Sequence, residues 1–388
     1  MGTRAVLVLA GILVALAAGE MGLRATGSDA RRLFETHARH ESARGKFCEY
    51  DGVRGWRGIR NADDDFEDVD TRHHVHQTHF GSRGTELPLE RSSKRRIVVL
   101  GGSFVWGYGV EDAELFTELL ARDTGDEVVN LGVPGYGADQ ALLMWRQLGG
   151  QFQPNVVLLV VTPSDDVASV LVTERDGRPK PRFRLDATEG LAMENVPVPE
   201  TEGPWNAEET PAPAAPPSAL VVAASRSALV AAVLKGAGRL PPRQTGDVAP
   251  NVLALTPQDE ATRTGVTTLG FLLMGLAANV KATGAELVVT SVPTVVQVDD
   301  ALRAELVRTH PPPAGGAWDF DAPGRTVQDL CRLAGVRYVD LLPDLRSAMG
   351  SDPYLYYRWN LHWTPVGHRV VAATLARELQ QPRAPASR

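Results

Sequence analysis

Five short apolar runs, rich in β-branched residues, constrain the fold of this chain more than any other feature. Each run ends at Gly, Pro, Ser or Thr. Runs of this kind are typical of strands that are buried on both faces of a parallel sheet. They are IVVLGG (97–102), EVVNLG (127–132), VVLLVV (156–161), ELVVTSVP (286–293) and RYVDLLP (337–343).

Segments with helical spacing of apolar residues separate these runs and close the chain. The alternation of strand and helix predicts a three-layer α/β/α sandwich, with a five-stranded parallel doubly wound sheet of flavodoxin-like type. The predicted helices cover 112–123, 138–150, 268–284, 324–335 and 365–381.

We expect one domain over 97–388, interrupted by an insertion at about 171–265. The insertion contains two proline-rich stretches, 210–219 and 240–250, with a predicted helix over 218–238 between them. Such proline-rich stretches form semi-rigid linkers or loops without a packed core. A shorter insertion, THPPPAGGAWDFDAP, precedes the fourth predicted helix.

Residues 28–96 are charged, rich in Arg, Asp and His, and poor in long periodic runs. We interpret them as an N-terminal arm that crosses the surface of the domain. His74 and His76 alternate onto one face of a predicted strand there. No carboxylate or Cys keeps a ligand spacing with them, so we expect no metal site.

The N-terminus has the layout of a secretory segment. Fifteen uncharged residues, AVLVLAGILVALAAG, follow Arg4, and small residues such as Ala15 and Ala17 stand where a signal peptidase could cut. Met21 and Leu23 continue the apolar character, so both a signal peptide and a membrane anchor over residues 1–27 stay open. Either one predicts an extracytoplasmic location.

The net charge and the cysteine content limit the classes of partner and cofactor that we expect. The formal net charge of −7 argues against nucleic acid as a partner, because nucleic-acid binders usually carry a basic face. Cys48 and Cys331 are far apart and form no CxxC motif, so we expect neither a metal site nor a redox motif. Their pairing in an oxidising compartment stays open, and we expect no cofactor.

Residues suited to chemistry follow the predicted strands at one edge of the sheet. GGSFVWGYG follows the first strand, NLGVPGYGADQ the second and TPSDDV the third, and YLYYRWNLHWTPVGH comes after the fifth. Ligands of open parallel sheets bind beyond the carboxyl ends of the strands. A serine, a glycine turn and a histidine at that edge suit a nucleophile, an oxyanion hole and a general base.

These motifs resemble those of the SGNH (GDSL-type) hydrolases, in the secreted branch that often bears an N-terminal membrane segment. The resemblance runs from about 97 to 381 apart from the insertions, and YDGVRGWRGIR (50–60) is similar to the lead-in of that branch. It implies an α/β/α esterase, lipase, or carbohydrate O-acyl hydrolase or transferase.

The resemblance assigns roles to individual residues. Ser103 is the nucleophile, and Gly102 stands where the family name has Asp. His362 is the general base. The oxyanion hole is expected from Ser103, the backbone N–H of Gly135 and position 165, and each preorganised donor there is worth roughly 3 kcal/mol.

Two signature side chains depart from the family pattern. The third block ends in Gly-Asn-Asp in the family but reads Ser164-Asp165-Asp166 here, and an ionised Asp165 accepts hydrogen bonds only. Asn360 replaces the Asp two residues before His362. Its oxygen can hold the imidazole in one tautomer but cannot stabilise an imidazolium charge.

Three interpretations follow from these departures. The chain works with a Ser103–His362 dyad and backbone donors, with Ser164 as the third-block donor if the alignment shifts by one residue. Alternatively, Asp165 orients His362 across the site. In the third, the site is a binding pocket that has lost its reaction.

The first interpretation predicts an extracytoplasmic serine esterase or O-acyl hydrolase or transferase. Its partner would be an acylated glycan, a lipid ester or another small-molecule ester, attacked through an acyl-serine intermediate. The third predicts a catalytically impaired SGNH-fold binding protein of the cell envelope. Five aromatic residues at the same edge either line the pocket or pack in the core: Trp106, Tyr108, Tyr136, Trp359 and Trp363.

Overall fold

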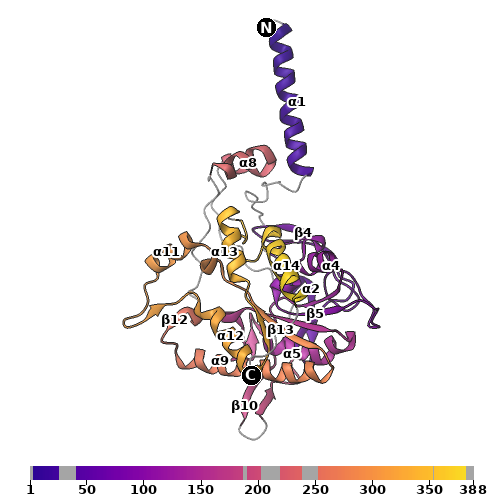
Figure 1. The fold of residues 1–388 in the computed structure, drawn as a ribbon, viewed down its shortest axis with the longest axis vertical. Helices are drawn as coiled ribbons and strands as arrows, with labels where there is room; N and C mark the ends of the chain where they lie inside the picture. The colour runs from indigo at the N-terminus through magenta and orange to yellow at the C-terminus, as the bar shows by residue number, and fades with distance from the viewer. Residues whose placement is uncertain are drawn as a thin grey trace.

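A five-stranded parallel sheet forms the centre of the computed structural model, which describes residues 3–25, 41–186, 190–201, 219–237, 252–352 and 354–381 (Figure 1). The strand order is β15-β13-β7-β5-β6. Counted along the chain from the opposite edge, this is the 2-1-3-4-5 order of flavodoxin-like sheets, so the predicted fold class is confirmed. The strands are β5 (Arg96–Gly101), β6 (Glu127–Gly132), β7 (Val156–Val161), β13 (Glu286–Ser291) and β15 (Arg337–Val339).

The parallel register aligns the ends of the central strands. Leu100 of β5 pairs with Leu131 of β6 on one side and with Leu159 of β7 on the other. The segments that leave these three strands therefore start at one common edge of the sheet.

Helices cover both faces of the sheet (Figure 1). Strand side chains alternate between the two layers: Val98 and Leu100 belong to one buried cluster, and Ile97 and Val99 belong to the other. One layer contains α5 (Ala138–Gln147), α9 (Glu260–Ala282) and α12 (Ala322–Ala334); the other contains α4 (Phe116–Thr124), α13 (Leu342–Ser351) and α14 (Pro365–Gln380).

Helix α9 begins earlier than position 268, where the sequence pattern placed it. The side chain of Asp259 accepts a hydrogen bond from the backbone N–H of Thr262 at 2.7 Å and so caps the helix. The insertion thus ends before 265. Helix α9 is long and apolar enough to cross a membrane by length and composition alone, but Leu269, Leu272 and Leu276 on it are buried in the core.

The insertion begins with two hairpins, β8 (Glu174–Arg175)–β9 (Arg178–Pro179) and β10 (Arg182–Asp186)–β11 (Gly190–Glu194). Lys180 follows β9, and its ammonium forms a fully buried ion pair with Asp139 of α5. This pair fixes the first hairpin to a helix of the sandwich.

The single helix predicted over 218–238 is wrong. The chain forms two helices, α7 (Ala219–Arg226) and α8 (Ala228–Gly236). Ser227 between them has an extended backbone, and its hydroxyl accepts a hydrogen bond from the N–H of Val230, which starts the second helix. The proline-rich stretches lie outside the described residues apart from Ala219.

The described part of the arm folds onto the domain instead of only crossing its surface. Phe47, Phe66 and Val75 are buried together with Trp106, which follows β5. The arm contributes α2 (Ala43–Phe47) and two antiparallel hairpins, β1 (Cys48–Asp51)–β2 (Gly55–Gly58) and β3 (Asp63–Glu67)–β4 (Arg72–His76).

Both cysteines are buried free thiols, so the pairing of Cys48 with Cys331 that the sequence left open does not occur. Shorter elements complete the described fold: α3 (Ser103–Trp106), α6 (Pro163–Ser169), α10 (Val295–Val298), α11 (Asp300–Thr309), and β12 (Leu255–Thr256) paired with β14 (Ala317–Trp318).

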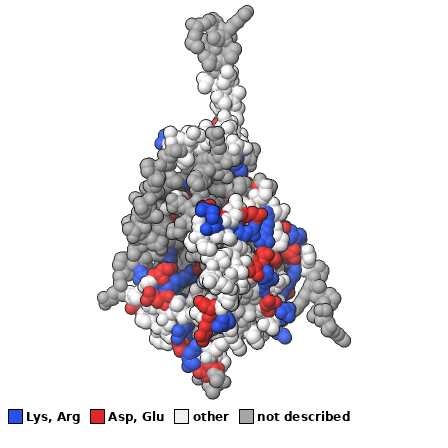
Figure 2. Space-filling model, turned by 90° about the vertical axis from the view of Figure 1, so that its left-hand side faces the viewer, with Lys and Arg blue, Asp and Glu red and all other residues white. Residues whose placement is uncertain are grey.

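Helix α1 (Thr3–Ala25) projects from the body beside α8 (Figure 1). Its described upper part carries no charge, whereas Lys and Arg are intermixed with Asp and Glu on the face of the body in Figure 2. Near its end, the Glu20 carboxylate accepts hydrogen bonds from the N–H groups of Ala228 and Leu229 at 2.9 Å each. This carboxylate caps α8 and links it to α1.

Candidate active site

The turn after β5 presents Ser103 at the edge of the sheet. Ser103 starts the short helix α3, and Gly102 precedes it. A Cβ atom at Gly102 would lie 2.8 Å from the backbone oxygen of Tyr136, so a side chain does not fit. This close approach explains why the turn carries Gly where the family name has Asp.

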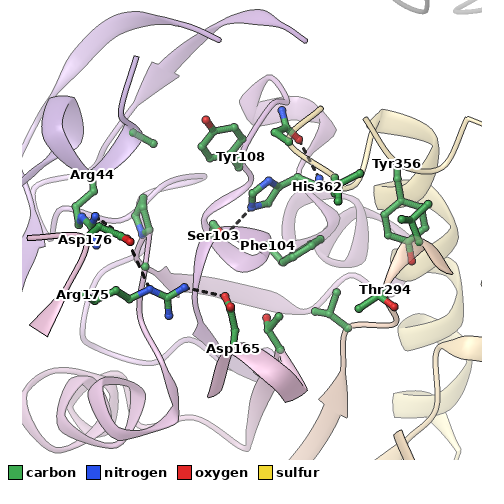
Figure 3. A pocket seen from close by; sticks show the side chains of 18 of the residues that line it. Arg44, Ser103, Phe104, Tyr108, Asp165, Arg175, Asp176, Thr294, Tyr356 and His362 are labelled. Atoms are coloured by element: carbon green, nitrogen blue, oxygen red, sulfur yellow. Dashed lines mark hydrogen bonds and ion pairs between the residues drawn. The ribbon is translucent and has the colours of Figure 1, made fainter. Parts of the chain in front are cut away.

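His362 meets Ser103 from the other end of the chain (Figure 3). Its Nε2 lies 2.7 Å from Ser103 Oγ. A hydrogen bond of this length lets the imidazole accept the hydroxyl proton. The structure thus brings together the two residues that the motifs proposed as nucleophile and base.

Two aromatic rings enclose the His362 imidazole. Tyr108 stacks on it with a centroid distance of 4.4 Å, and Phe104 lies at 4.7 Å. Burial lowers the pKa of His362 to about 4, so the ring is neutral at pH 7. Within the described chain, Nδ1 is buried and has no hydrogen-bond partner.

The role expected of Asn360 is corrected by this geometry. Its side-chain oxygen accepts a hydrogen bond from the backbone N–H of His362 at 2.9 Å, and its amide donates to Asp68 at 2.7 Å. Neither group holds the imidazole. Asn360 orders the loop that carries His362, and the stacked rings fix the plane of the imidazole.

Two arm carboxylates that the sequence analysis missed support this loop. Asp70 accepts hydrogen bonds from the backbone N–H groups of Trp359 and Asn360 at 2.8 Å each. Asp68 accepts from Asn360 and is fully buried, and burial together with nearby Asp70 raises its pKa to about 6. The segment EDVD carried no periodic signal, and its partners lie almost 300 positions away.

Gly135 lies where the second block was expected to supply an oxyanion donor. It lines the same cavity as Ser103 and has a φ of +81°, a conformation that favours glycine. The Asp166 carboxylate links this loop to the third block. It accepts hydrogen bonds from the backbone N–H groups of Ala138 at 2.5 Å and Thr162 at 2.6 Å. Burial raises the pKa of Asp166 to about 7.

Asp165 lines the cavity as an acceptor, whereas Ser164 does not line it. The Asp165 carboxylate pairs with Arg175 at 2.8 Å. It makes no hydrogen bond to His362, so the alternative in which Asp165 orients the imidazole is not supported. The shifted alignment with Ser164 as donor also lacks support.

A charged wall of the cavity was not foreseen. Asp176 and Gly177 form the tip of the β8–β9 hairpin, and both have positive φ, as Asp-Gly turns require. Arg44 of α2 pairs with Asp176 at 2.8 Å, and Arg175 lies between Asp176 and Asp165 (Figure 3). These residues come from the arm and the insertion, outside the three strand-end blocks.

The opposite wall of the cavity is apolar. The cavity has a volume of about 530 Å³, with Ser103 and His362 on its lining. Of the five aromatics considered, Tyr108 lines it, whereas Trp106 and Trp363 are buried in the core. The apolar wall combines Phe104 of α3 and Tyr356 with four residues that follow β13, which are Val292, Pro293, Val295 and Val296.

The two strand-borne histidines are engaged with acidic residues. His74 pairs with Asp63 at 2.6 Å and with Asp65 at 3.1 Å, and His76 pairs with Asp63 at 3.4 Å. Within the described residues, no group of three or more His, Cys, Asp or Glu side chains is placed to hold a metal ion.

A family model described as "SGNH hydrolase-like domain, acetyltransferase AlgX" matches residues 255–388. This stretch contains β13, β15, α14 and the block around His362. The match confirms the resemblance to SGNH hydrolases that the motifs indicated.

Solved structures similar to this chain include a member of the lipolytic protein G-D-S-L family from Veillonella parvula, a lipase/acylhydrolase from Enterococcus faecalis and an acetylxylan esterase from Geobacillus stearothermophilus. In that order, the identities are 10%, 13% and 12%, and the TM-scores are 0.37, 0.36 and 0.37. The alignments cover 73%, 74% and 76% of this chain and 97%, 95% and 97% of the others. No curated protein matches the sequence.

Replacing Asn360 by the family's Asp is expected to destabilise the chain. The new carboxylate would face Asp68, whose oxygen lies 2.7 Å from the present amide nitrogen. Because like charges at this distance cannot both ionise, Asn360→Asp should cost about 1–3 kcal/mol at pH 7.5. The double variant Asp68→Asn/Asn360→Asp exchanges the two ends of the contact and should recover most of the loss. Urea unfolding measures both, with exposed Glu90→Gln as control. Equal stability of parent and single variant would contradict the prediction.

The rate of serine modification is expected to persist into acid. The base must be neutral to accept the Ser103 proton, and the pKa of His362 is lowered from 6.5 to about 4. The rate of labelling by a fluorophosphonate should therefore fall with a midpoint near pH 4. Circular dichroism at each pH separates this limb from unfolding. A midpoint near 6.5 in folded protein would show that the imidazole is not held neutral.

Proposed function

We propose that this chain, which carries an SGNH hydrolase-like domain, removes or transfers an ester-linked acyl group through an acyl-serine intermediate. The observation that carries the proposal is the 2.7 Å contact between Ser103 Oγ and His362 Nε2 at a cavity on the carboxyl edge of the sheet. A serine hydroxyl becomes an effective nucleophile when a neighbouring base takes its proton.

The reaction would proceed in two halves. Ser103 Oγ attacks the ester carbonyl carbon while His362 Nε2 takes the hydroxyl proton, and the carbonyl π electrons move onto oxygen. Collapse of this tetrahedral species breaks the bond to the alcohol, which leaves with the proton from His362. Water or a second hydroxyl then attacks the acyl-serine, again with His362 as base, and releases the acid or a new ester.

The two walls of the cavity support an orientation for the substrate. The acyl group would lie against the apolar wall formed by Val292, Pro293, Val295 and Val296. The alcohol would lie toward the polar wall with Asp165 and Arg175. We propose an acylated glycan or a lipid ester as the substrate class, and the acetyltransferase description of the matched family supports transfer as well as hydrolysis.

We also propose an extracytoplasmic location with α1 as a membrane anchor. The 23-residue helix is about 34 Å long, enough for a hydrocarbon core of about 30 Å. Five of its described large apolar side chains are exposed: Ile12, Leu13, Val14, Leu16 and Met21. These features support a segment that stays in the bilayer more than one buried in protein.

The anchored state predicts that the full chain stays with membranes through an alkaline carbonate wash and keeps its first residues. A C-terminal alkaline phosphatase fusion should be active, because that reporter needs the disulfides of an oxidising compartment. A soluble chain that begins near residue 18 would identify a cleaved signal peptide. An inactive fusion would contradict the extracytoplasmic location.

The acyl-serine proposal predicts covalent labelling by a fluorophosphonate and slow release of p-nitrophenol from p-nitrophenyl acetate. Ser103→Ala should abolish both, and His362→Gln should lower the rates by about 10²–10⁴-fold because the proton acceptor is lost. Ser92→Ala, an exposed serine ahead of β5, is the matched control and should leave both rates unchanged. Equal rates in the parent and Ser103→Ala would favour the binding-protein alternative. The lack of a partner for His362 Nδ1 among the described residues also favours that alternative.

A further inference from the structure

The acidic residue in the third block leaves the proposed oxyanion hole without a side-chain donor. Asp165 stands where the family resemblance implies a side-chain N–H donor, and an ionised carboxylate only accepts. Two nitrogens of its partner Arg175 already face carboxylates, because Nη2 lies 2.8 Å from Asp165 and Nε lies 3.8 Å from Asp176. The other guanidinium on the cavity lining is that of Arg44.

Arg44 carries an unused donor on that lining. Its side chain is only 10% exposed. Its Nη1 is buried and has no hydrogen-bond partner within the described residues. Leaving a buried charged nitrogen without a partner is costly, so such atoms in folded proteins commonly await a ligand or water. Arg44 lines the same cavity as Ser103 and Gly135.

The surroundings of Arg44 hold its guanidinium in place. Nη2 donates to Asp176 at 2.8 Å, and the guanidinium lies over the Trp56 ring with its carbon 5.0 Å from the centroid. Trp56 is itself fixed, because its Nε1 donates to the backbone oxygen of Pro134 at 2.9 Å. An anchored guanidinium loses little freedom when it binds a further oxygen.

Arg44 Nη1 also lies next to the glycine that offers the backbone donor. The nitrogen is 3.1 Å from the position that a Cβ atom would occupy on Gly135. The pairing of Arg44 with Asp176 leaves Nη1, and not Nη2, directed to this side. The guanidinium of Arg44 and the residue that offers the backbone N–H, Gly135, therefore lie side by side on the lining of the cavity that also contains Ser103.

We infer that Arg44 supplies the side-chain donor of the oxyanion hole and binds the negatively charged oxygen that forms when Ser103 attacks the ester carbonyl. The inference rests on the proposed function. The interaction forms as the carbonyl π electrons move onto oxygen, and it is released when the carbonyl re-forms with loss of the alcohol. Arg44 thereby takes over the task that position 165 cannot perform.

Replacing Arg44 by methionine in the full chain in detergent tests the inference. We expect kcat for p-nitrophenyl acetate and the fluorophosphonate labelling rate to fall by about 10²–10³-fold, the usual loss of one oxyanion donor, with KM little changed. Arg57→Met is the matched control. Arg57 belongs to the same arm and pairs with Glu49 outside the cavity, so its rates should match those of the parent.

A second variant separates the role from a structural one. In Arg44→Ala, added guanidinium at a non-denaturing concentration should restore part of the rate, whereas urea should not, because the lost group is a cationic donor. If Arg44→Met does not fold, as judged by circular dichroism, this rescue carries the test.

Three results would overturn the inference. They are parent-like rates in folded Arg44→Met, a rise in KM with kcat unchanged, and an Arg44→Ala variant that guanidinium does not rescue. Each of them leaves the acyl-serine proposal standing when the parent is labelled at Ser103. A parent chain no more reactive than Ser103→Ala would overturn both.

Discussion

The contact between Ser103 and His362 depends on a loop whose regular structure is limited to one antiparallel bridge between Tyr356 and Trp363. The loop after β15 and α13 must bring an imidazole from position 362 to the tip of β5, and Leu361 within it adopts a φ of +59°, which is unfavourable for a side-chain-bearing residue. Such a conformation persists only where its surroundings hold it. Here the carboxylate of Asp70 binds consecutive backbone N–H groups, and Asp68 binds Asn360. The arm therefore maintains the geometry on which the proposed chemistry depends.

The proposed base, His362, is held in place by packing against aromatic rings more than by a charged partner. A carboxylate beside Nδ1 would raise the pKa of the imidazole and stabilise its cation. In this chain Nδ1 has no partner among the described residues, and two aromatic rings enclose the imidazole. The consequence is a neutral but weak base, because burial lowers its pKa more than the charge of Asp165 and the hydrogen bond with Asn360 raise it. With a weak base, the groups that stabilise the oxyanion must contribute more to lowering the activation barrier.

The sequence predicted what depends on local pattern. The β-branched runs predicted the five-stranded sheet, and the polar blocks after the strands predicted that Ser103, Gly135, Asp165 and His362 would share one edge. It did not predict Asp68 or Arg44, because neither lies in a periodic segment and their partners are distant in the chain. The role of Asn360 was predicted wrongly for a related reason. The spacing to His362 was right, but Asp68 and the His362 backbone already occupied the amide.

At both positions that depart from the family pattern, the altered side chain has a polar partner from another part of the chain. At position 360 an amide replaces a carboxylate, and a carboxylate appears at Asp68, 2.7 Å away. At position 165 a carboxylate replaces an amide, and the cation Arg175 appears 2.8 Å away. Each swap is thus balanced by a residue from outside the strand-end blocks, in the arm for one and in the insertion hairpin for the other. Random loss of function would not be expected to place a matching acceptor beside the amide at 360 and a matching cation beside the carboxylate at 165. The arm and the hairpin therefore belong to the candidate site as much as the sheet does, and a domain boundary drawn at residue 97 divides that site.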